Sequence, residues 1–145
     1  HRGGVLDDRG AVLRIRKTQE KTILTYKEKV PNTTDFKQQI EHETTVGDVD
    51  AVEAIIQKLG YKLSAVYEKH RKAWHLGNCE VVLDELPFGY YMEIEGTIDD
   101  INATEKLLGV ENLELEPRGY PRLTSKLGVD VNGVMESRFA KTQPA

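Results

Sequence analysis

The sequence contains little cysteine and histidine, and it has no long apolar run. Its single cysteine, Cys79, cannot form a disulfide within the chain, which favours a reducing, cytoplasmic setting. Its four histidines show neither a zinc-ligand spacing nor an H-E-x-x-H pair. No apolar run approaches the roughly 18 residues of a membrane span, and no charged and then apolar signal segment opens the chain. We therefore expect no disulfide framework, no zinc site of a familiar spacing and no membrane partner.

An excess of positive charge is also missing. Twenty Lys and Arg residues stand against 24 Asp and Glu residues, which leaves a formal net charge of -4. Such a chain has no net basic field of the kind that nucleic acid selects, so we expect no nucleic-acid partner. The length of 145 residues suits one domain, and 39% hydrophobic residues suffice for a core. Because we find no linker, low-complexity tract or repeat, the sequence predicts a single domain over residues 1–145.

Short segments rich in Thr, Val, Ile and Tyr, with Gly, Asn or Pro between them, predict a mostly β structure. The segments cover residues 12–17, 22–29, 38–46, 62–75, 80–86 and 90–97. Consecutive segments should pair as antiparallel neighbours. The clearest hairpin turn lies at Gly77 and Asn78, since both residues readily adopt the positive φ that tight turns require.

Helices interrupt the predicted strands. Asp48 is a good N-cap for a helix that ends at Gly60. Asp99 or Asp100 can cap a second helix that ends at Gly109, and a short third helix is predicted over residues 121–128. The predicted fold is therefore of the α+β class, an antiparallel β-barrel with a few helices packed outside.

Charged residues recur in like-signed pairs on the predicted strands. Residues i and i+2 of a strand point to the same face, so each pair shares a face. The pairs are Arg14 with Arg16, Glu41 with Glu43, Lys69 with Arg71, and Glu93 with Glu95, while Lys27 and Asp84 stand singly. Each pair alone is typical of a solvated strand face. Together they indicate a ligand, because like charges on one strand repel each other.

If the strands close into a barrel with these side chains inside, the interior holds five cations and five anions. Desolvation costs several kcal/mol per ion, so such an interior must be wet and filled by a ligand. Arginine and lysine bind polyphosphate, and carboxylates tolerate that polyanion when a divalent cation lies between them. Hard oxygen ligands suit Mg²⁺ or Mn²⁺. The pattern therefore predicts a metal-bound phosphate chain.

Six sequence blocks resemble the successive motifs of the CYTH superfamily, the triphosphate tunnel metalloenzymes. They are LRIRK (13–17), LTYKEK (24–29), IEHET (40–44), YEKHRKAW (67–74), VVLDELPFG (81–89) and YMEIEG (91–96). No block is specific alone, but all six occur in the family's order. The resemblance implies an antiparallel β-barrel that encloses a tunnel. It also implies an N-terminal E-x-E-x-K strand, which the sequence does not contain before Val5 and which we expect upstream of His1.

The resemblance assigns roles to individual residues. Cations that resemble the family's triphosphate ligands are Arg14, Arg16, Lys27, Lys69, Arg71 and, by a looser match, Lys126. Carboxylates that resemble its metal ligands are Asp84, Glu93 and Glu95, with Glu41 and Glu43 as a second tier. No catalytic residue is assigned beyond these binding groups.

The implied activity is a Mg²⁺- or Mn²⁺-dependent phosphohydrolase that acts on inorganic triphosphate, thiamine triphosphate or a nucleoside triphosphate. Two alternatives stay open: an adenylyl cyclase of the class IV type that forms cyclic AMP from ATP, and a non-catalytic barrel that binds polyphosphate or nucleotide. The expected partner is the small-molecule substrate, and the expected state is a monomer or weak dimer.

Four other residues have simpler interpretations. His70 should point away from the face of its strand neighbours Lys69 and Arg71, so it is an outer-face residue rather than a general base. Trp74 and Tyr67 are expected to fill a core, and Cys79 is expected to act as a small hydrophobic residue.

Overall fold

The computed structural model describes residues 5–31 and 39–141. The described residues divide between two compact units, His1–Lys62 and Leu63–Ala145. They form mostly β structure, as the sequence predicts, with four helices, of which the sequence predicts three. No helix in these two ranges combines the length and the hydropathy that a membrane crossing requires.

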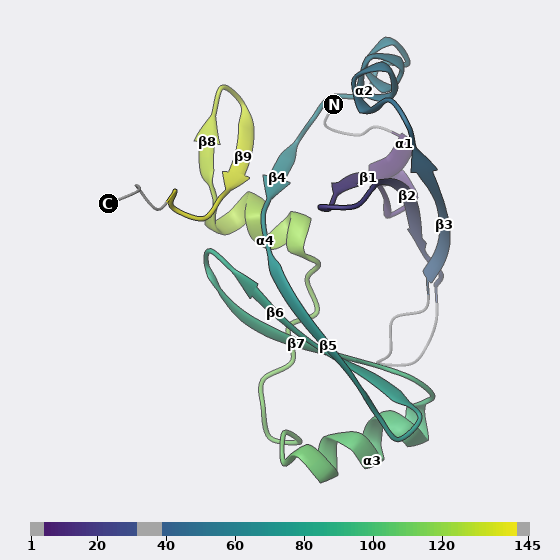
Figure 1. Cartoon of the computed structure of the whole chain (residues 1–145), viewed down its shortest axis with the longest axis vertical. Coiled ribbons are helices and arrows are strands. Elements are labelled where there is room, and N and C mark those ends of the chain that lie inside the picture. Colours follow the sequence, from purple (N-terminus) through teal and green to yellow (C-terminus); the bar gives the residue numbers. More distant parts are fainter. Residues whose placement is uncertain (1–4, 32–38, 142–145) are drawn as a thin grey trace. The chain divides into compact units, whose positions relative to one another are not determined.

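The first unit contains one antiparallel sheet. Its elements are α1 (Val5–Asp8), β1 (Ala11–Lys17), β2 (Thr22–Lys29), β3 (Gln39–Val46) and α2 (Val49–Lys58). The strand order is β1-β2-β3, so each strand pairs with the next one along the chain (Figure 1). The predicted strands at 12–17, 22–29 and 38–46 are confirmed within a residue of each end, although position 38 lies outside the described ranges.

Helix α2 begins at the predicted cap. The Asp48 carboxylate accepts a hydrogen bond from the backbone N–H of Ala51 at 3.0 Å. This contact satisfies one of the free N–H groups of the first turn. The helix ends before Gly60, which adopts a φ of 95°.

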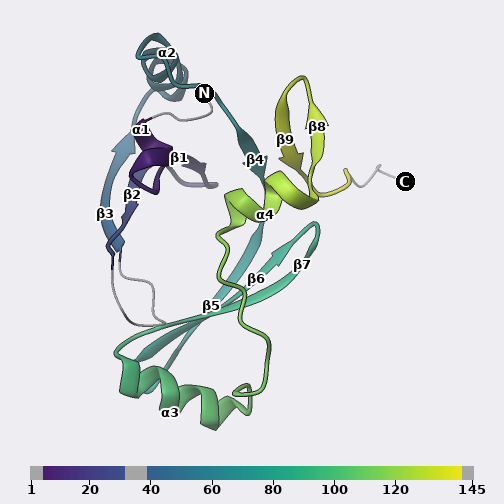
Figure 2. The same cartoon turned by 180° about the vertical axis from the view of Figure 1, so that it is seen from behind.

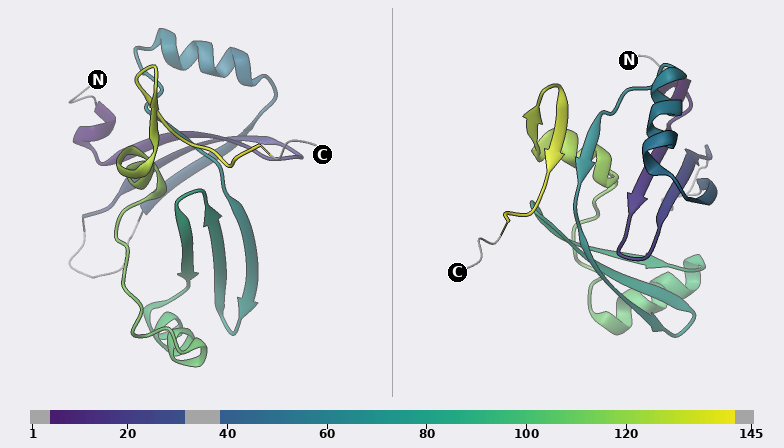
Figure 3. Two further views of the ribbon diagram at one scale, coloured as in Figure 1. Left: turned by 90° about the vertical axis from the view of Figure 1, so that its left-hand side faces the viewer. Right: turned by 45° about the horizontal axis from the view of Figure 1, so that its top comes forward.

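The second unit contains an antiparallel sheet of three long strands, β5 (His70–Leu76), β6 (Cys79–Leu86) and β7 (Gly89–Glu95). Figure 3 shows them side by side as a meander. The predicted hairpin between β5 and β6 is confirmed, and Gly77 supplies the positive φ of its turn, at 58°.

A smaller sheet of the second unit differs from the prediction. The single strand predicted at 62–75 is wrong, because β4 (Ala65–Tyr67) and β5 belong to different sheets. Strand β4 pairs in parallel with β9 (Val134–Ser137), which also pairs with β8 (Val129–Val131). The chain therefore changes hydrogen-bonding partners between Tyr67 and His70.

Two helices complete the second unit. Helix α3 (Ile98–Leu108) is capped by Thr97, whose hydroxyl accepts from the N–H of Asp100 at 3.2 Å. The predicted cap at Asp99 or Asp100 is wrong, because both acids lie in the first turn, where they favour the helix dipole. Helix α4 (Tyr120–Leu127) confirms the predicted third helix.

Both helices of the second unit pack against sheets. Helix α3 contacts β6 and β7, and α4 contacts β4 and β9 (Figure 2). In α4, Leu123 and Thr124 are fully buried, and Leu123 packs with Leu86. In the described residues the nine strands form three separate three-stranded sheets. The closed barrel and the single domain over 1–145 stay predictions.

We expect Gly128→Ala to lower the free energy of unfolding by about 1 to 3 kcal/mol, the cost of overpacking. A Cβ at this position would lie 2.6 Å from the carbonyl oxygen of Thr124 and 2.7 Å from that of Glu136. Gly119→Ala, at the other end of α4, is the matched control, since its Cβ would meet only Pro121 at 3.7 Å. Urea unfolding measures both variants. Equal stability of the two would contradict the close backbone approach at Gly128.

Candidate functional site

The first candidate face lies on the β1-β2-β3 sheet. Residues directly paired across neighbouring strands lie on the same face of a sheet. The register pairs Arg14 with Thr25, and Thr25 with Glu43. Five of the predicted site residues thereby share this face: Arg14, Arg16, Lys27, Glu41 and Glu43.

The carboxylates of this face have polar partners. Lys27 Nζ lies 3.4 Å from an oxygen of Glu41. The hydroxyl of the fully buried Thr25 donates to Glu43 at 3.0 Å. This hydrogen bond is the largest cause that holds the pKa of Glu43 below its ordinary value, and the charges of nearby arginines add to it. Glu43 therefore stays ionised at neutral pH beside the cations.

The arginines of this face differ at their Nε atoms. The Nε atoms of Arg14 and Arg16 are buried, and neither has a hydrogen-bond acceptor within the described ranges. Buried N–H donors are nearly always satisfied in folded proteins, and a bound anion supplies the acceptors that these two require. The two arginines are therefore suited to bind an oxyanion.

The second candidate face lies on the β5-β6-β7 sheet. The register pairs Asp84, in the central strand, with Arg71 on β5 and with Tyr91 on β7. The alternation along β7 adds two acids to this face, and Lys69 reaches it from just before β5. The predicted site residues that share this face are Lys69, Arg71, Asp84, Glu93 and Glu95.

Asp84 is the centre of this face and has no exposed surface. Arg71 donates to both of its oxygens, from Nε to Oδ1 at 2.7 Å and from Nη2 to Oδ2 at 2.6 Å. Lys69 Nζ donates to Oδ2 at 3.3 Å, and the Tyr120 hydroxyl donates to Oδ2 at 2.7 Å. One carboxylate therefore holds two cations and a phenol.

These contacts shift the ionisation of the cluster. Burial alone would raise the pKa of Asp84, but the hydrogen bonds from Arg71 and Tyr120 and the charge of Lys69 lower it below its ordinary value. Burial, followed by the charge of Arg71, lowers the pKa of Lys69. Burial and the hydrogen bond to Asp84 raise the pKa of Tyr120, so the phenol keeps its proton and donates.

Tyr120 is the residue of this cluster that the sequence did not predict. It is the first residue of α4, and its ring packs edge-on against Tyr67 and Tyr91, with centroids at 6.0 and 5.6 Å. Lys69 Nζ lies 5.1 Å from the Tyr120 ring centroid, which is within the range of a cation–π contact. Tyr67 is thus half-buried among aromatic rings.

The remaining acids of this face are more accessible. Glu93 lies 3.5 Å from Arg71 Nη2, and its side chain is 42% exposed. Glu95, at the end of β7, is exposed. No three His, Cys, Asp or Glu side chains within residues 5–31 and 39–141 form a metal-binding group. As hard oxygen donors, Glu93 and Glu95 fit Mg²⁺ or Mn²⁺, whereas four protein donors already occupy the oxygens of Asp84.

The other predicted residues lie elsewhere. Lys126 is exposed on the last turn of α4. Hydrogen bonds from Arg118 lower the pKa of Glu116 to about 2, and the charge of Lys126 makes a smaller contribution. Cys79 is buried, as predicted, but Trp74 is half-exposed, so its prediction as a core residue is wrong.

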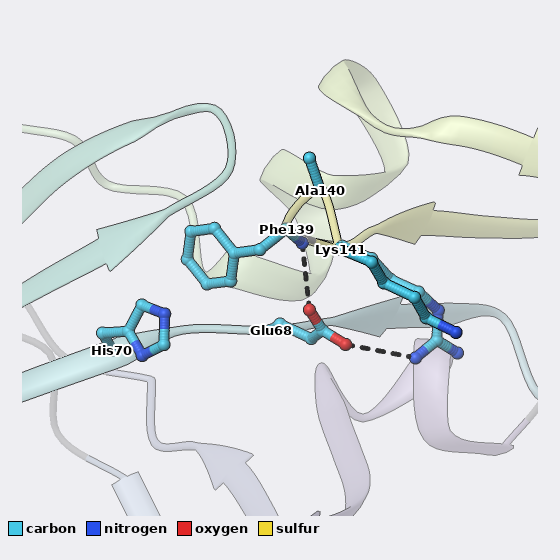
Figure 4. Close-up of a pocket in the computed structure, with 6 residues that line it drawn as sticks. Glu68, His70, Phe139, Ala140 and Lys141 are labelled. Atoms are coloured by element: carbon cyan, nitrogen blue, oxygen red, sulfur yellow. Dashed lines mark hydrogen bonds and ion pairs between the residues drawn. The ribbon is translucent and has the colours of Figure 1, made fainter. Parts of the chain in front are cut away.

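His70, the first residue of β5, lines a separate cavity of about 400 Å³ (Figure 4). Its ring stacks on Phe139 with centroids 4.4 Å apart. Glu68 accepts from the Phe139 N–H at 2.9 Å and lies 3.5 Å from Arg138. None of the predicted phosphate or metal ligands lines this cavity. By alternation along β5, His70 and Arg71 point to opposite faces, as predicted.

Comparison with known proteins gives the family. The sequence profile of the CYTH domain matches residues 2–120. The chain belongs to the CYTH domain family. Its members form the triphosphate tunnel metalloenzyme superfamily, whose enzymes are typically dependent on a divalent metal.

Two solved structures resemble the chain. A conserved hypothetical protein from Pyrococcus furiosus has a TM-score of 0.69 and 26% identity, and the match covers 79% of this chain and 76% of that one. A protein from Pyrococcus horikoshii OT3 has the same TM-score and identity, with coverage of 78% and 74%. No curated protein matches the chain.

We expect Lys69 to titrate below 10.5, the ordinary lysine value, because burial and the neighbouring Arg71 disfavour its charged form. The side chain therefore loses its positive charge at a lower pH than an exposed lysine. An NMR titration of the lysine Cε and Nζ signals, with Lys69→Arg to assign the signal, measures this. A midpoint at or above 10.5 would show that Asp84 outweighs burial.

Proposed function

We propose that this CYTH domain protein is a divalent-metal-dependent phosphohydrolase that acts on triphosphate-containing small molecules. The observation that carries the proposal is the sorting of five cations onto two sheet faces that also bear acids: Arg14, Arg16, Lys27, Lys69 and Arg71. On a sheet face that only contacts water, buried arginine N–H groups without acceptors are not expected. A bound phosphate chain would offer such groups acceptor oxygens along its whole length.

The closed barrel tunnel around the substrate is part of this proposal, as are the state of a monomer or weak dimer and the cytoplasmic setting. The family resemblance supports the tunnel. Because each face carries both signs of charge, each can contact a phosphate chain together with its counter-ion.

The cations have two roles in such a reaction. They fix the phosphate chain, and they neutralise the charge that develops on the leaving oxygen when water attacks the terminal phosphorus. Arg14 and Arg16 fit the first role, since their buried N–H groups lack acceptors in the described part of the chain. Arg71 fits both roles, since its guanidinium is held in one orientation by Asp84.

Glu93 and Glu95 are the residues that would hold the metal, together with Glu41 and Glu43 as secondary candidates. A divalent cation held there would supply positive charge that stabilises the negative charge of the phosphate groups. These acids also repel an unaccompanied polyanion, which favours entry of the metal-bound substrate over the free one.

A substrate panel tests the proposal. Tripolyphosphate, thiamine triphosphate and ATP are incubated with the protein and Mg²⁺ or Mn²⁺, and both phosphate release and cyclic AMP are measured. Phosphate release supports the hydrolase. Cyclic AMP from ATP would replace it with the cyclase, and tight binding without turnover would replace it with the non-catalytic binding barrel.

We expect Arg71→Ala to weaken triphosphate binding by about 1.5 to 3 kcal/mol, or roughly 10- to 150-fold, the scale of a charge-assisted contact. Arg16→Ala should have an effect of the same order. The matched controls are the neighbouring residues on the opposite faces, Lys72→Ala and Lys17→Ala, which should change binding less than twofold. Calorimetric titration with tripolyphosphate compares the four variants. Equal losses in a variant and its neighbour would show that net charge, and not the face, determines binding.

We expect chelation by EDTA to abolish activity, and Glu93→Gln or Glu95→Gln to raise the metal concentration for half-maximal activity by on the order of tenfold. Each change removes a charge and keeps the shape of the side chain. Glu85→Gln, on the opposite face of the same sheet, is the control and should leave the metal requirement unchanged. Activity that persists in chelator would exclude the metal-dependent mechanism.

A further inference from the structure

The carboxylate of Asp84 accepts from four donor atoms of the protein, three of them on Oδ2. An ionised carboxylate has about four lone-pair sites. Oδ1 accepts from Arg71 Nε, and Oδ2 accepts from Arg71 Nη2, Lys69 Nζ and the Tyr120 hydroxyl. The residue is also fully buried. A metal ion at Asp84 would have to share Oδ1 with Arg71 or displace a donor from Oδ2, and it would lie directly beside two cations.

We infer that Asp84 is a positioning residue rather than a metal ligand, and that together with Tyr120 it holds Arg71 and Lys69 in place for the triphosphate chain. This inference rests on the proposed function, and it departs from the metal-binding role that the family resemblance implies for Asp84.

The geometry of Arg71 supports this role. Asp84 engages the side edge of the guanidinium, which is formed by Nε and Nη2. The two N–H groups of Nη1 and the second N–H of Nη2 remain, and they form the end of the fork that grips an oxyanion in a bidentate manner. An oxygen of the half-exposed Glu93 lies 3.5 Å from Nη2, so Glu93 competes only weakly with an oxyanion for the N–H groups at this end. Asp84 therefore fixes the guanidinium without using its phosphate-binding edge.

Tyr120 completes the arrangement from a different element. Its hydroxyl donates to Asp84 Oδ2, and its ring lies 5.1 Å from Lys69 Nζ. The tyrosine is itself buried at the start of α4, among half-buried aromatic side chains. The phenol thereby restrains both the anchor and one of the cations, so that Lys69 and Arg71 keep a fixed spacing.

The experiment measures tripolyphosphate affinity without metal, in EDTA, and separately the metal concentration for half-maximal activity. The variants are Tyr120→Phe and Asp84→Asn. Tyr90→Phe is the matched control, because it removes the same hydroxyl from a contact with Glu85 on the opposite face of the sheet.

We expect Tyr120→Phe to weaken metal-free tripolyphosphate binding by roughly 3- to 10-fold, the scale of one lost hydrogen bond, here the bond to Asp84. Asp84→Asn should weaken it by more than tenfold. Neither should change the metal requirement by more than twofold, and Tyr90→Phe should change nothing. Should Asp84→Asn fail to fold, Tyr120→Phe decides alone, since it keeps the ring and its packing.

The inference would be overturned if the folded variants bind metal-free tripolyphosphate as well as wild type, or more tightly. It would also be overturned if they need more metal for half-maximal activity, and that result would restore Asp84 as a metal ligand. If the wild-type protein fails to bind tripolyphosphate both in EDTA and with Mg²⁺ or Mn²⁺, the proposed function falls together with this inference. Binding by wild type that the variants fully retain overturns the positioning role alone. NMR gives a readout that is independent of the substrate: the Arg71 Nε–H should exchange slowly with solvent in wild type and faster in Tyr120→Phe.

Discussion

Burying an ionised carboxylate away from water costs free energy, and Asp84 is fully buried. An isolated buried charge would take up a proton rather than remain ionised. Here the compensation comes from Arg71, Lys69 and Tyr120, which lie on or beside β5 and at the start of α4. The cations in turn could not be buried this far without the anion. The arrangement of this sheet face thus depends on one ion cluster, and removing any member leaves the others uncompensated.

The arginines of the two charged faces differ in their hydrogen-bond partners. On the β5-β6-β7 sheet, Arg71 is anchored by a bidentate contact. On the β1-β2-β3 sheet, the main-chain register brings Arg14 and Arg16 onto the face with Glu43, but their buried Nε atoms have no acceptor among the described residues. The first arrangement is organised by the protein alone, whereas the arginines of the second keep donors that an oxyanion could use.

The sequence predicts the strands and their faces well, because both follow from local patterns. Alternation places Arg14 with Arg16, and Glu93 with Glu95, and it requires no knowledge of neighbouring strands. The helix N-cap at Asp48 is equally local. The sequence holds a further local signal: Asn132 and Gly133, both with positive φ, form the turn between β8 and β9, and Asn-Gly is the residue pair most typical of tight hairpins.

Contacts between residues far apart in the sequence cannot be predicted in this way. No pattern in the sequence connects Tyr120 to Asp84, or β9 to the parallel strand β4, because these contacts depend on how α4 returns to the sheet. The division of the predicted strand at 62–75 has the same origin. Local preference favours strand throughout, and only the change of partner from β9 to β6 decides where it breaks.

The parallel pairing of β4 has a consequence for the order of folding during synthesis. Beyond β4, the Glu68 N–H donates to the Ser137 carbonyl at 2.9 Å. The Glu68 carboxylate also accepts from the N–H of Phe139, 71 positions away. Closing so long a loop is slow and gains nothing until its far end arrives. The β5-β6-β7 meander can form as soon as it leaves the ribosome, but β4 waits for nearly the whole chain. During that interval the residues next to Lys69 lack their final neighbours, and the exposed edge of β4 is open to association with other nascent chains.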